Sequence, residues 1–231
     1  MNNRLLTQPL RLPWRGGFSF FGIFTALSLP DLPMNYSRDI ILENNRVRLR
    51  PLESSDFEYL KRIAFDEDIW RYMTTLAPRN NVELAAYVAQ SIRARADRQR
   101  YPFVIIDRET GRIAGCTSYG NLALPDRRLE IGWTWLGTEF QRTGINRAAK
   151  HLLLHYAFGE LDCERVELKT DARNQKSREA MVRMGATEEG TLRSHMALPN
   201  GQRRDTVYYS ILRPEWDELR QTVFHEFDSR G

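Results

Sequence analysis

The chain has 231 residues, of which 42% are hydrophobic and 28% are charged, as in a soluble globular protein with one sizeable core. The formal net charge of +4 suits an anionic ligand, but basic and acidic residues are intermixed, so no nucleic-acid partner is required. Cys116 and Cys163 lie far apart without metal-ligand spacing, which argues against a disulfide framework and a structural zinc site. We expect both cysteines in the core and the protein in a reducing cytoplasm.

A leader precedes the expected domain. Three arginines come before the apolar run of residues 18–29, which has the outline of a signal peptide but is too short to span a membrane. One interpretation is export or an interfacial anchor. The other, which we favour because nothing downstream looks secreted, is a non-native leader before Met34. We therefore expect residues 1–33 to be non-native or disordered, residues 34–231 to form one domain, and no membrane partner.

The first elements of the domain are a strand and two helices. Residues 46–52 alternate apolar and charged side chains, which is typical of a half-buried strand. Ser55 followed by Glu58 resembles a capping box and predicts the first helix. Asn80 and Asn81 can cap a second helix with a cluster of arginines at its end. This cluster either suits the negative end of the helix dipole or forms a docking patch for an acidic partner. Its members are Arg93, Arg95, Arg98 and Arg100.

Three strands are predicted next, and further strands and helices alternate after them. The order predicts a mixed sheet with helices on both faces. The three strands cover residues 101–107, 112–120 and 128–136, and the first two form a hairpin. The later elements are a helix from residue 145, a strand at 165–170, a helix from Asn174 that ends before Gly185, strands at 187–192 and 206–212, and a terminal helix from Pro214.

A glycine turn joins the third of these strands to a helix. Apolar residues recur at helical spacing from Ile145 to Tyr156, directly after Gly144. Glycine lets backbone N–H groups approach a ligand, and the positive end of the helix dipole points at the same spot, so the turn favours a phosphate or pyrophosphate. A second polar helix start, Asn174 with Ser177, follows the next strand. Adjacent parallel strands would bring both helix starts to one edge of the sheet.

Several of these segments together resemble a known family. They are Glu130-Ile131-Gly132-Trp133, Gln141-x-x-Gly144, Asn174-x-x-Ser177, Met184-Gly185-Ala186 and the segments 189–193 and 204–207. Residues 46–212 resemble the GNAT family of acetyl-CoA-dependent N-acetyltransferases, most of all the branch similar to the bacterial ribosomal-protein N-terminal (Rim-type) enzymes. The resemblance implies an α/β fold of the α+β kind. Its central sheet would have about seven mostly antiparallel strands, flanked by helices and splayed at the cofactor cleft.

The resemblance also implies a cofactor site. The loop of residues 141–146 would cradle the pyrophosphate of acetyl-CoA, and the pantetheine arm would lie between two splayed strands, beginning at Glu130 and Arg165. Two positions depart from the family pattern. Asn146 stands where glycine or alanine is usual, and Met181 stands where many members have the tyrosine that protonates the leaving thiolate. The implied cofactor-binding residues are Trp135, Leu136, Gln141, Arg142, Thr143, Gly144, Ile145, Asn146, Asn174 and Ser177, with no metal.

Acetyl transfer needs a neutral amine, a donor for the developing oxyanion and a proton for the leaving thiolate. Glu130 is the candidate base, and its alternative role is an ion pair with Arg128 or another cation. Ser177 is the hydroxyl that the family pattern places nearest the thiolate, and its alternative role is a hydrogen bond at a helix start. A backbone N–H near Trp135 or Leu136 is the candidate oxyanion donor.

Two further groups of side chains have competing interpretations. His151 and His155 lie one turn apart but lack the glutamate of a zinc-protease motif, so we expect both on the surface. Trp133 and Trp135 either wall the acceptor cleft or pack the two sides of the sheet, and the pattern favours packing.

The sequence thus predicts an N-acetyltransferase that moves an acetyl group from acetyl-CoA to a primary amine by direct attack in a ternary complex. The acceptor is a peptide N-terminus, as the resemblance suggests, or a small amine. The alternative from another class is a non-catalytic acyl-CoA-binding module, which the methionine at position 181 favours. We expect acetyl-CoA as cosubstrate, no metal, no nucleic acid, a cytoplasmic location, and a homodimer as one arrangement.

Overall fold

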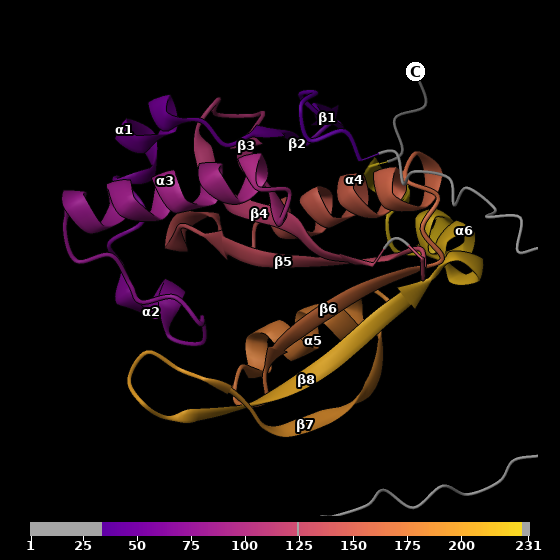
Figure 1. Cartoon of the computed structure of the whole chain (residues 1–231). Coiled ribbons are helices and arrows are strands. Elements are labelled where there is room, and N and C mark those ends of the chain that lie inside the picture. The colour runs from indigo at the N-terminus through magenta and orange to yellow at the C-terminus, as the bar shows by residue number, and fades with distance from the viewer. Residues whose placement is uncertain (1–33, 124, 228–231) are drawn as a thin grey trace, which may run out of the picture. The chain divides into compact units, whose positions relative to one another are not determined.

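The computed structural model describes residues 34–123 and 125–227, so the leader expected for residues 1–33 lies outside the described residues. Eight strands of the described part form one sheet in the order β1-β2-β3-β4-β5-β6-β8-β7. Neighbouring strands are antiparallel except for β5 and β6, which are parallel. The predicted mixed, mostly antiparallel sheet is confirmed, with one strand more than expected (Figure 1).

The elements follow the predicted order closely. The strands are β1 (Leu42–Glu43), β2 (Val47–Pro51), β3 (Arg100–Asp107), β4 (Ile113–Ala123), β5 (Arg128–Leu136), β6 (Arg165–Asp171), β7 (Thr187–Ala197) and β8 (Arg203–Leu212). The helices are α1 (Phe57–Leu60), α2 (Glu67–Trp70), α3 (Asn81–Ala96), α4 (Ile145–Gly159), α5 (Gln175–Arg183) and α6 (Arg213–Thr222).

Helix caps explain where two of these helices start. The Asn80 side chain accepts a hydrogen bond from the Glu83 backbone N at 3.0 Å, so α3 begins as predicted. The predicted capping box before α1 is wrong in its residues. There the Asp56 carboxylate accepts from the Glu53 backbone N at 2.8 Å, and the Arg50 guanidinium fixes Asp56 with hydrogen bonds of 2.9 and 2.5 Å. This ion pair with β2 places the cap two residues earlier than Ser55.

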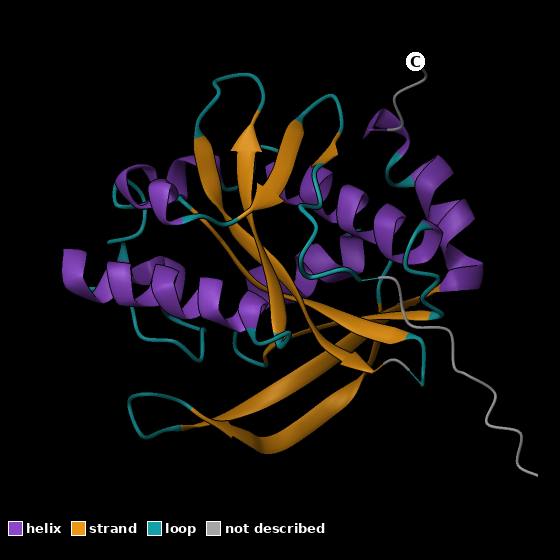
Figure 2. Cartoon of the chain, turned by 45° about the horizontal axis from the view of Figure 1, so that its top comes forward, coloured by secondary structure: helices purple, strands orange, loops and turns teal. Residues whose placement is uncertain are grey.

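Helices α3 and α4 cover opposite faces of β5. Trp135 Nε1 donates to Tyr87 Oη on α3 at 2.8 Å, whereas Lys150 on α4 donates to Thr134 Oγ1 at 2.7 Å. Neighbouring side chains of a strand point to opposite faces of the sheet. The predicted layering, with helices on both faces, is therefore confirmed, and Figure 2 shows helices on both sides of the strands.

Strands β5 and β6 separate shortly after they begin. Only Arg128–Glu130 and Arg165–Glu167 are paired, after which β5 continues beside β4 and β6 continues beside β8. Figure 1 shows the two strands diverging from the end where they meet. We call this divergence the splay. Its position, starting at Glu130, matches the sequence expectation.

A β-bulge interrupts β5 within the splay. Between the positions opposite Ser118 and Cys116, β5 contains one residue more than β4. Trp133 in this bulge has φ of 50°, a left-handed conformation that bulky residues rarely adopt. A Cβ at Gly120 would overlap the Trp133 ring, so the glycine on β4 makes room for the indole. The bulge thus reorients β5 where its ladder to β6 has ended.

The C-terminal elements bury one side of α4. The His151 ring lies 5.8 Å from the rings of Phe224 and Phe227 and 6.0 Å from that of Trp216, and the residue is only 4% exposed. The expectation that His151 lies on the surface is therefore wrong, because α6 and the turn after it pack over it. His155 is exposed, as predicted. Both cysteines are buried, also as predicted. Within the described residues, every helix is too short or too polar to cross a membrane.

Candidate functional site

The N-terminus of α4 is open and oriented like an anion site. Gly144 is the N-cap with φ of 86°, and a Cβ there would find no heavy atom within 4 Å. Ile145 is fully buried and fixes the first turn against the core. The first N–H groups of a helix have no partner inside it and carry the positive end of its dipole. Open helix N-termini of this kind suit phosphate groups.

The loop before this turn is held by its own side chains. Gln141 Nε2 donates to the Leu136 carbonyl at 3.2 Å, and Thr143 Oγ1 donates to the Phe140 carbonyl at 2.7 Å. Arg142 has φ of 64° and an exposed side chain. The loop is thus curled at two positions, Arg142 and Gly144, and presents a guanidinium beside the helix start.

Asn146 lies in the first turn of α4. Its Oδ1 is buried and, among the described residues, accepts no hydrogen bond. An unpaired buried oxygen is costly unless a ligand or water supplies a donor. The residue that departs from the family pattern therefore offers an acceptor at the same helix start.

A second helix start follows the parallel neighbour of β5. Asn174 Oδ1 accepts from the Ser177 backbone N at 3.2 Å, so Asn174 caps α5, while the Ser177 side chain is half-buried. Because β5 and β6 are parallel, α4 and α5 start from the same edge of the sheet. Met181 on α5 is buried and offers no hydroxyl to this edge. The structure thus brings the two predicted helix starts to the same edge of the sheet.

Glu130 lies where the splay begins and is 3% exposed. Its Oε2 is 2.8 Å from Lys169 Nζ on β6 and accepts a hydrogen bond from Asn121 Nδ2 at 2.6 Å. A Cβ at Gly132 would lie 2.6 Å from Oε1, so the glycine leaves room for the carboxylate. The ion pair weighed for Glu130 is present, but its cation is Lys169 and not Arg128. The pair fixes the carboxylate at the point where the strands part.

Trp135 and Leu136 end the splayed part of β5, and both are buried. The Trp135 ring lies 5.0 Å from that of Trp70 and faces α3, so its side chain packs in the core. Trp133 is half-buried, with the Arg100 guanidinium carbon 5.1 Å from its ring centre. The favoured packing interpretation therefore holds for Trp135, while Trp133 keeps one part of its ring accessible.

Lys150 is a buried cation that the sequence patterns did not single out. It is 5% exposed, and its ammonium donates to Thr134 Oγ1 at 2.7 Å. Burial lowers the pKa of Lys150 to about 7, against the opposing effect of the Glu130 charge. The sequence signal that could have singled out Lys150 is its spacing of four residues from Asn146. That spacing puts both side chains on one face of α4.

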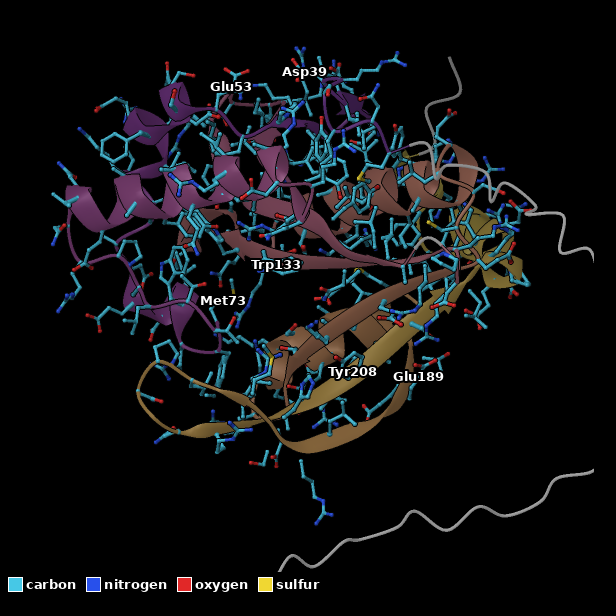
Figure 3. All side chains as sticks on the ribbon, viewed as in Figure 1. Asp39, Glu53, Met73, Trp133, Glu189 and Tyr208 are labelled. Atoms are coloured by element: carbon cyan, nitrogen blue, oxygen red, sulfur yellow. The ribbon has the colours of Figure 1, made fainter. Side chains whose placement is uncertain are left out.

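Polar side chains of β6 and β8 lie on the side of the splay opposite β5. Lys169 Nζ lies 5.8 Å from the centre of the Tyr208 ring. Arg204 on β8 is buried, which lowers its pKa, and its NH1 donates to the Tyr72 carbonyl at 3.3 Å. Figure 3 shows Trp133 on β5, Tyr208 on β8 and Met73 in the segment that follows α2. Within the described residues, no group of three or more His, Cys, Asp or Glu side chains could hold a metal ion.

Residues 46–187 match the family model described as "Acetyltransferase (GNAT) domain". The chain belongs to the GNAT acetyltransferase family. This GNAT chain is 41% identical over 107 residues to "Putative ribosomal N-acetyltransferase YdaF" of Bacillus subtilis (strain 168). That match covers 46% of the chain and 57% of YdaF, so it spans less than two thirds of that relative. A second relative is the spermidine N(1)-acetyltransferase of Escherichia coli (strain K12), with 26% identity over 74% of the chain and 88% of that protein.

Solved GNAT structures share the fold. A GCN5-related N-acetyltransferase from Brucella melitensis superposes with a TM-score of 0.77 and 26% identity, over 81% of this chain and 85% of that one. The ribosomal-protein-S5-alanine acetyltransferase from Vibrio fischeri gives a TM-score of 0.62 over 77% of this chain and 99% of that one. Its identity is 21%, so this likeness concerns the fold alone.

Proposed function

We propose that this protein is an acetyl-CoA-dependent N-acetyltransferase that acylates a primary amine by direct attack in a ternary complex. The observation that carries the proposal is the splay of β5 and β6, which runs between a buried carboxylate, Glu130, and an open helix N-terminus at Gly144. A cosubstrate with an anionic end and a reactive end fits this arrangement. The family to which the chain belongs supports the same assignment.

The residues at the start of α4 fit the anionic end. Backbone N–H groups of the first turn would bind the pyrophosphate, and the open space at Gly144 lets it approach. Arg142 adds a positive charge, and Asn146 lies in the first turn of the same helix. Bound acetyl-CoA supplies an acyl group activated as a thioester. The backbone of Trp135 and Leu136 would orient it along the open edge of β5.

Glu130 would serve the acceptor amine. Its carboxylate is held by Lys169 and Asn121, so it is fixed in position before any substrate arrives. We assign it the removal of a proton from the acceptor ammonium through a water molecule. Ser177 and Asn174, at the start of α5, would line the thiol end of the site. A backbone N–H near Trp135 would stabilise the oxyanion.

We take the acceptor to be a peptide N-terminus. YdaF is named as a ribosomal acetyltransferase, and that similarity supports a protein substrate. A small amine is the second candidate, because the chain is also similar to a spermidine acetyltransferase.

Release of free thiol from acetyl-CoA, measured with a panel of peptides and small amines, tests the activity. We expect saturable release with at least one peptide that has a free α-amine. Saturable binding of coenzyme A with no release for any acceptor would favour the non-catalytic binding module instead.

The cofactor site is tested by Gly144→Asp. The added carboxylate would stand where the pyrophosphate binds, so we expect coenzyme A affinity to fall about tenfold or more in calorimetry. The matched control is Gly111→Asp, because Gly111 also has positive φ (69°) and a Cβ there would likewise meet no heavy atom within 4 Å. The control should leave affinity unchanged. Equal affinities of the two folded variants and the wild type would place the pyrophosphate elsewhere.

A further inference from the structure

Arg204 on β8 is a buried cation without a carboxylate partner. The residue is 6% exposed, and within the described part of the chain it forms no ion pair with an acidic side chain. Its Nη1 donates a long hydrogen bond of 3.3 Å to the Tyr72 carbonyl, and its Nε is buried without a hydrogen-bond partner among the described residues. Buried arginines are normally paired with carboxylates, because an uncompensated charge is costly in the interior.

The acidic side chains whose charges act on Arg204 are already paired with other cations. Asp171 on β6 accepts hydrogen bonds from the Arg173 guanidinium at 3.0 and 2.8 Å and from the Arg173 backbone N at 2.9 Å. Glu130 is paired with Lys169 at 2.8 Å. The charges cancel within each pair, so the guanidinium of Arg204 leaves one positive charge in excess.

A second unpaired polar atom lies on the same face of β8. Thr206 is fully buried, and its Oγ1 finds no hydrogen-bond partner in the described residues. Arg204 and Thr206 are two residues apart in the strand, so their side chains point to the same face of the sheet. The forked N–H groups of arginine match the two oxygens of a carboxylate, and the threonine hydroxyl adds a further donor.

The hydrogen bond made by Arg204 crosses the splay. Its acceptor, the Tyr72 carbonyl, lies two residues beyond Trp70, the last residue of α2. Helix α2 packs on the β5 side of the splay, because the Trp70 ring lies 5.0 Å from that of Trp135. The Arg204 side chain therefore reaches from β8 to a segment that is held on β5.

A row of side chains connects Arg204 with Glu130. Tyr208 shares the Arg204 face of β8, and its ring centre lies 5.8 Å from Lys169 Nζ, which is the ion-pair partner of Glu130. Tyr208 and Arg204 are four residues apart, roughly 13 Å of strand. The long side chains of arginine, lysine and glutamate shorten the span between the charged groups. An extended peptide with its amine at Glu130 would thus bring its second to fourth residue to Arg204.

We propose that Arg204 and Thr206 bind a carboxylate of the acceptor, so that the protein selects peptides with an acidic residue at the second, third or fourth position. This inference rests on the proposed acetyltransferase function and names its acceptor class. The carboxylate would take the place of the Tyr72 carbonyl beside the guanidinium. The segment between α2 and α3 contains no helix or strand, so its displacement would break no regular element.

Paired peptides test the selection with the wild-type protein. The two members of each pair differ by aspartate or asparagine at position 2, 3 or 4, and thiol release gives kcat/KM for each. We expect aspartate to be favoured about tenfold or more at one of these positions, because hydrogen bonds between charged groups are the stronger ones. Equal kcat/KM within every pair would overturn the proposal. Acetylation of free amino acids but of no peptide would show that the carboxylate belongs to an amino acid.

Arg204→Met removes the charge and keeps an unbranched side chain. It should lower kcat/KM for the aspartate peptide to that of its asparagine partner and leave the asparagine peptide unchanged. Thr206→Val keeps the shape of the side chain and should weaken the selection in part. The matched control is Arg203→Met, because Arg203 is exposed and its guanidinium bonds Ser194 instead. The control should keep the selection.

Two results with these variants would overturn the proposal. One is an equal loss of activity on both members of a pair in Arg204→Met, which would mean that Arg204 only holds the Tyr72 segment. The other is unchanged selection in both Arg204→Met and Thr206→Val. If Arg204→Met does not fold, the wild-type pairs and Thr206→Val decide.

Peptide binding separates this inference from the proposed function. Calorimetry with the protein saturated with coenzyme A compares the two members of each pair without turnover. Tighter binding of the aspartate peptide with no thiol release would contradict the enzyme and support the carboxylate site. Thiol release without any difference in binding or rate would contradict the carboxylate site alone.

Discussion

At the scale of single residues, Glu130 combines two properties that a base in this position needs. It is fixed by Lys169 and Asn121, and it lies where the strands begin to part. Its partner in the β5–β6 register is Glu167. Glu167 is also paired with arginines and is mostly buried, but it lies on β6, across the splay from Glu130. The two carboxylates therefore allow a controlled comparison.

We predict that Glu130→Gln slows acyl transfer by about 10²- to 10⁴-fold, because the amide cannot accept the ammonium proton. Coenzyme A affinity should stay within about twofold, since Glu130 lies at the start of the splay and the proposed pyrophosphate turn lies beyond the end of β5. Steady-state rates and calorimetry on both variants check this. Glu167→Gln should retain most of the activity, and equal losses in the two variants would mean that charge removal, and not a base, explains the effect.

At the scale of elements, α6 packs against α4, and we give it no part in the proposed site. Trp216 on α6 packs its ring 5.8 Å from that of Phe158 and 5.6 Å from that of Phe224, and Pro214 lies at the start of the helix. The contact supports the same helix whose other end is the proposed anion site. Stability and cofactor binding should therefore respond differently when this contact is removed.

Trp216→Ala should lower the free energy of unfolding by about 3–5 kcal/mol, the usual cost of removing a buried tryptophan ring. Denaturant unfolding measures this. Gln221→Ala on the exposed side of the same helix is the control and should change stability by less than about 0.5 kcal/mol. Folded Trp216→Ala should still bind coenzyme A. If binding falls by more than the fraction of unfolded protein accounts for, Trp216 does more than support α4.

The elements show how far sequence patterns reach. Helices α3, α4 and α5 and the strands β3 to β6 were predictable, because each has a cap or a clear period. The two-residue β1 and the four-residue α2 are too short for any period. Strand β7 runs to Ala197, five residues beyond the prediction, because Ser194 with φ of 51° interrupts the alternation without ending the strand.

The site was predictable only in part, for a related reason. The turn at Gly144 and the cap at Asn174 are local features that short motifs encode. The Glu130–Lys169 pair and the Lys150–Thr134 contact join segments 39 and 16 residues apart, and single-sequence patterns carry no information on such pairs. The burial of His151 likewise depends on Trp216 and the turn beyond it. The role of each predicted site residue stays a prediction.

At the scale of the whole molecule, the buried ammonium of Lys150 makes stability depend on pH. Its pKa of about 7 in the folded chain is lower than the ordinary lysine value of 10.5, which we take for the unfolded chain. Between these two values the unfolded chain binds a proton that the folded chain does not. The contribution of Lys150 to the free energy of unfolding therefore rises with pH across this window, by at most about 1.4 kcal/mol per pH unit.

We predict that wild-type stability increases with pH relative to Lys150→Met between about pH 7 and the ordinary lysine value of 10.5. Urea unfolding of both proteins at several pH values measures the difference between their free energies of unfolding. The titration of all other groups cancels in that difference. At the acid end of the window Lys150→Met should be the more stable protein. Parallel stability curves for the two proteins would show that Lys150 titrates normally in the folded state.

The short pairing of β5 with β6 has a mechanical consequence. Three residue pairs form the hydrogen-bonded seam between the strands β1 to β5 and the strands β6 to β8. Beyond this seam, the facing backbone groups of the two strands have no ladder to each other. An elongated substrate lying there would act as a temporary strand that ties the two halves together. Substrate concentration would then set the rigidity of the sheet as well as the occupancy of the site.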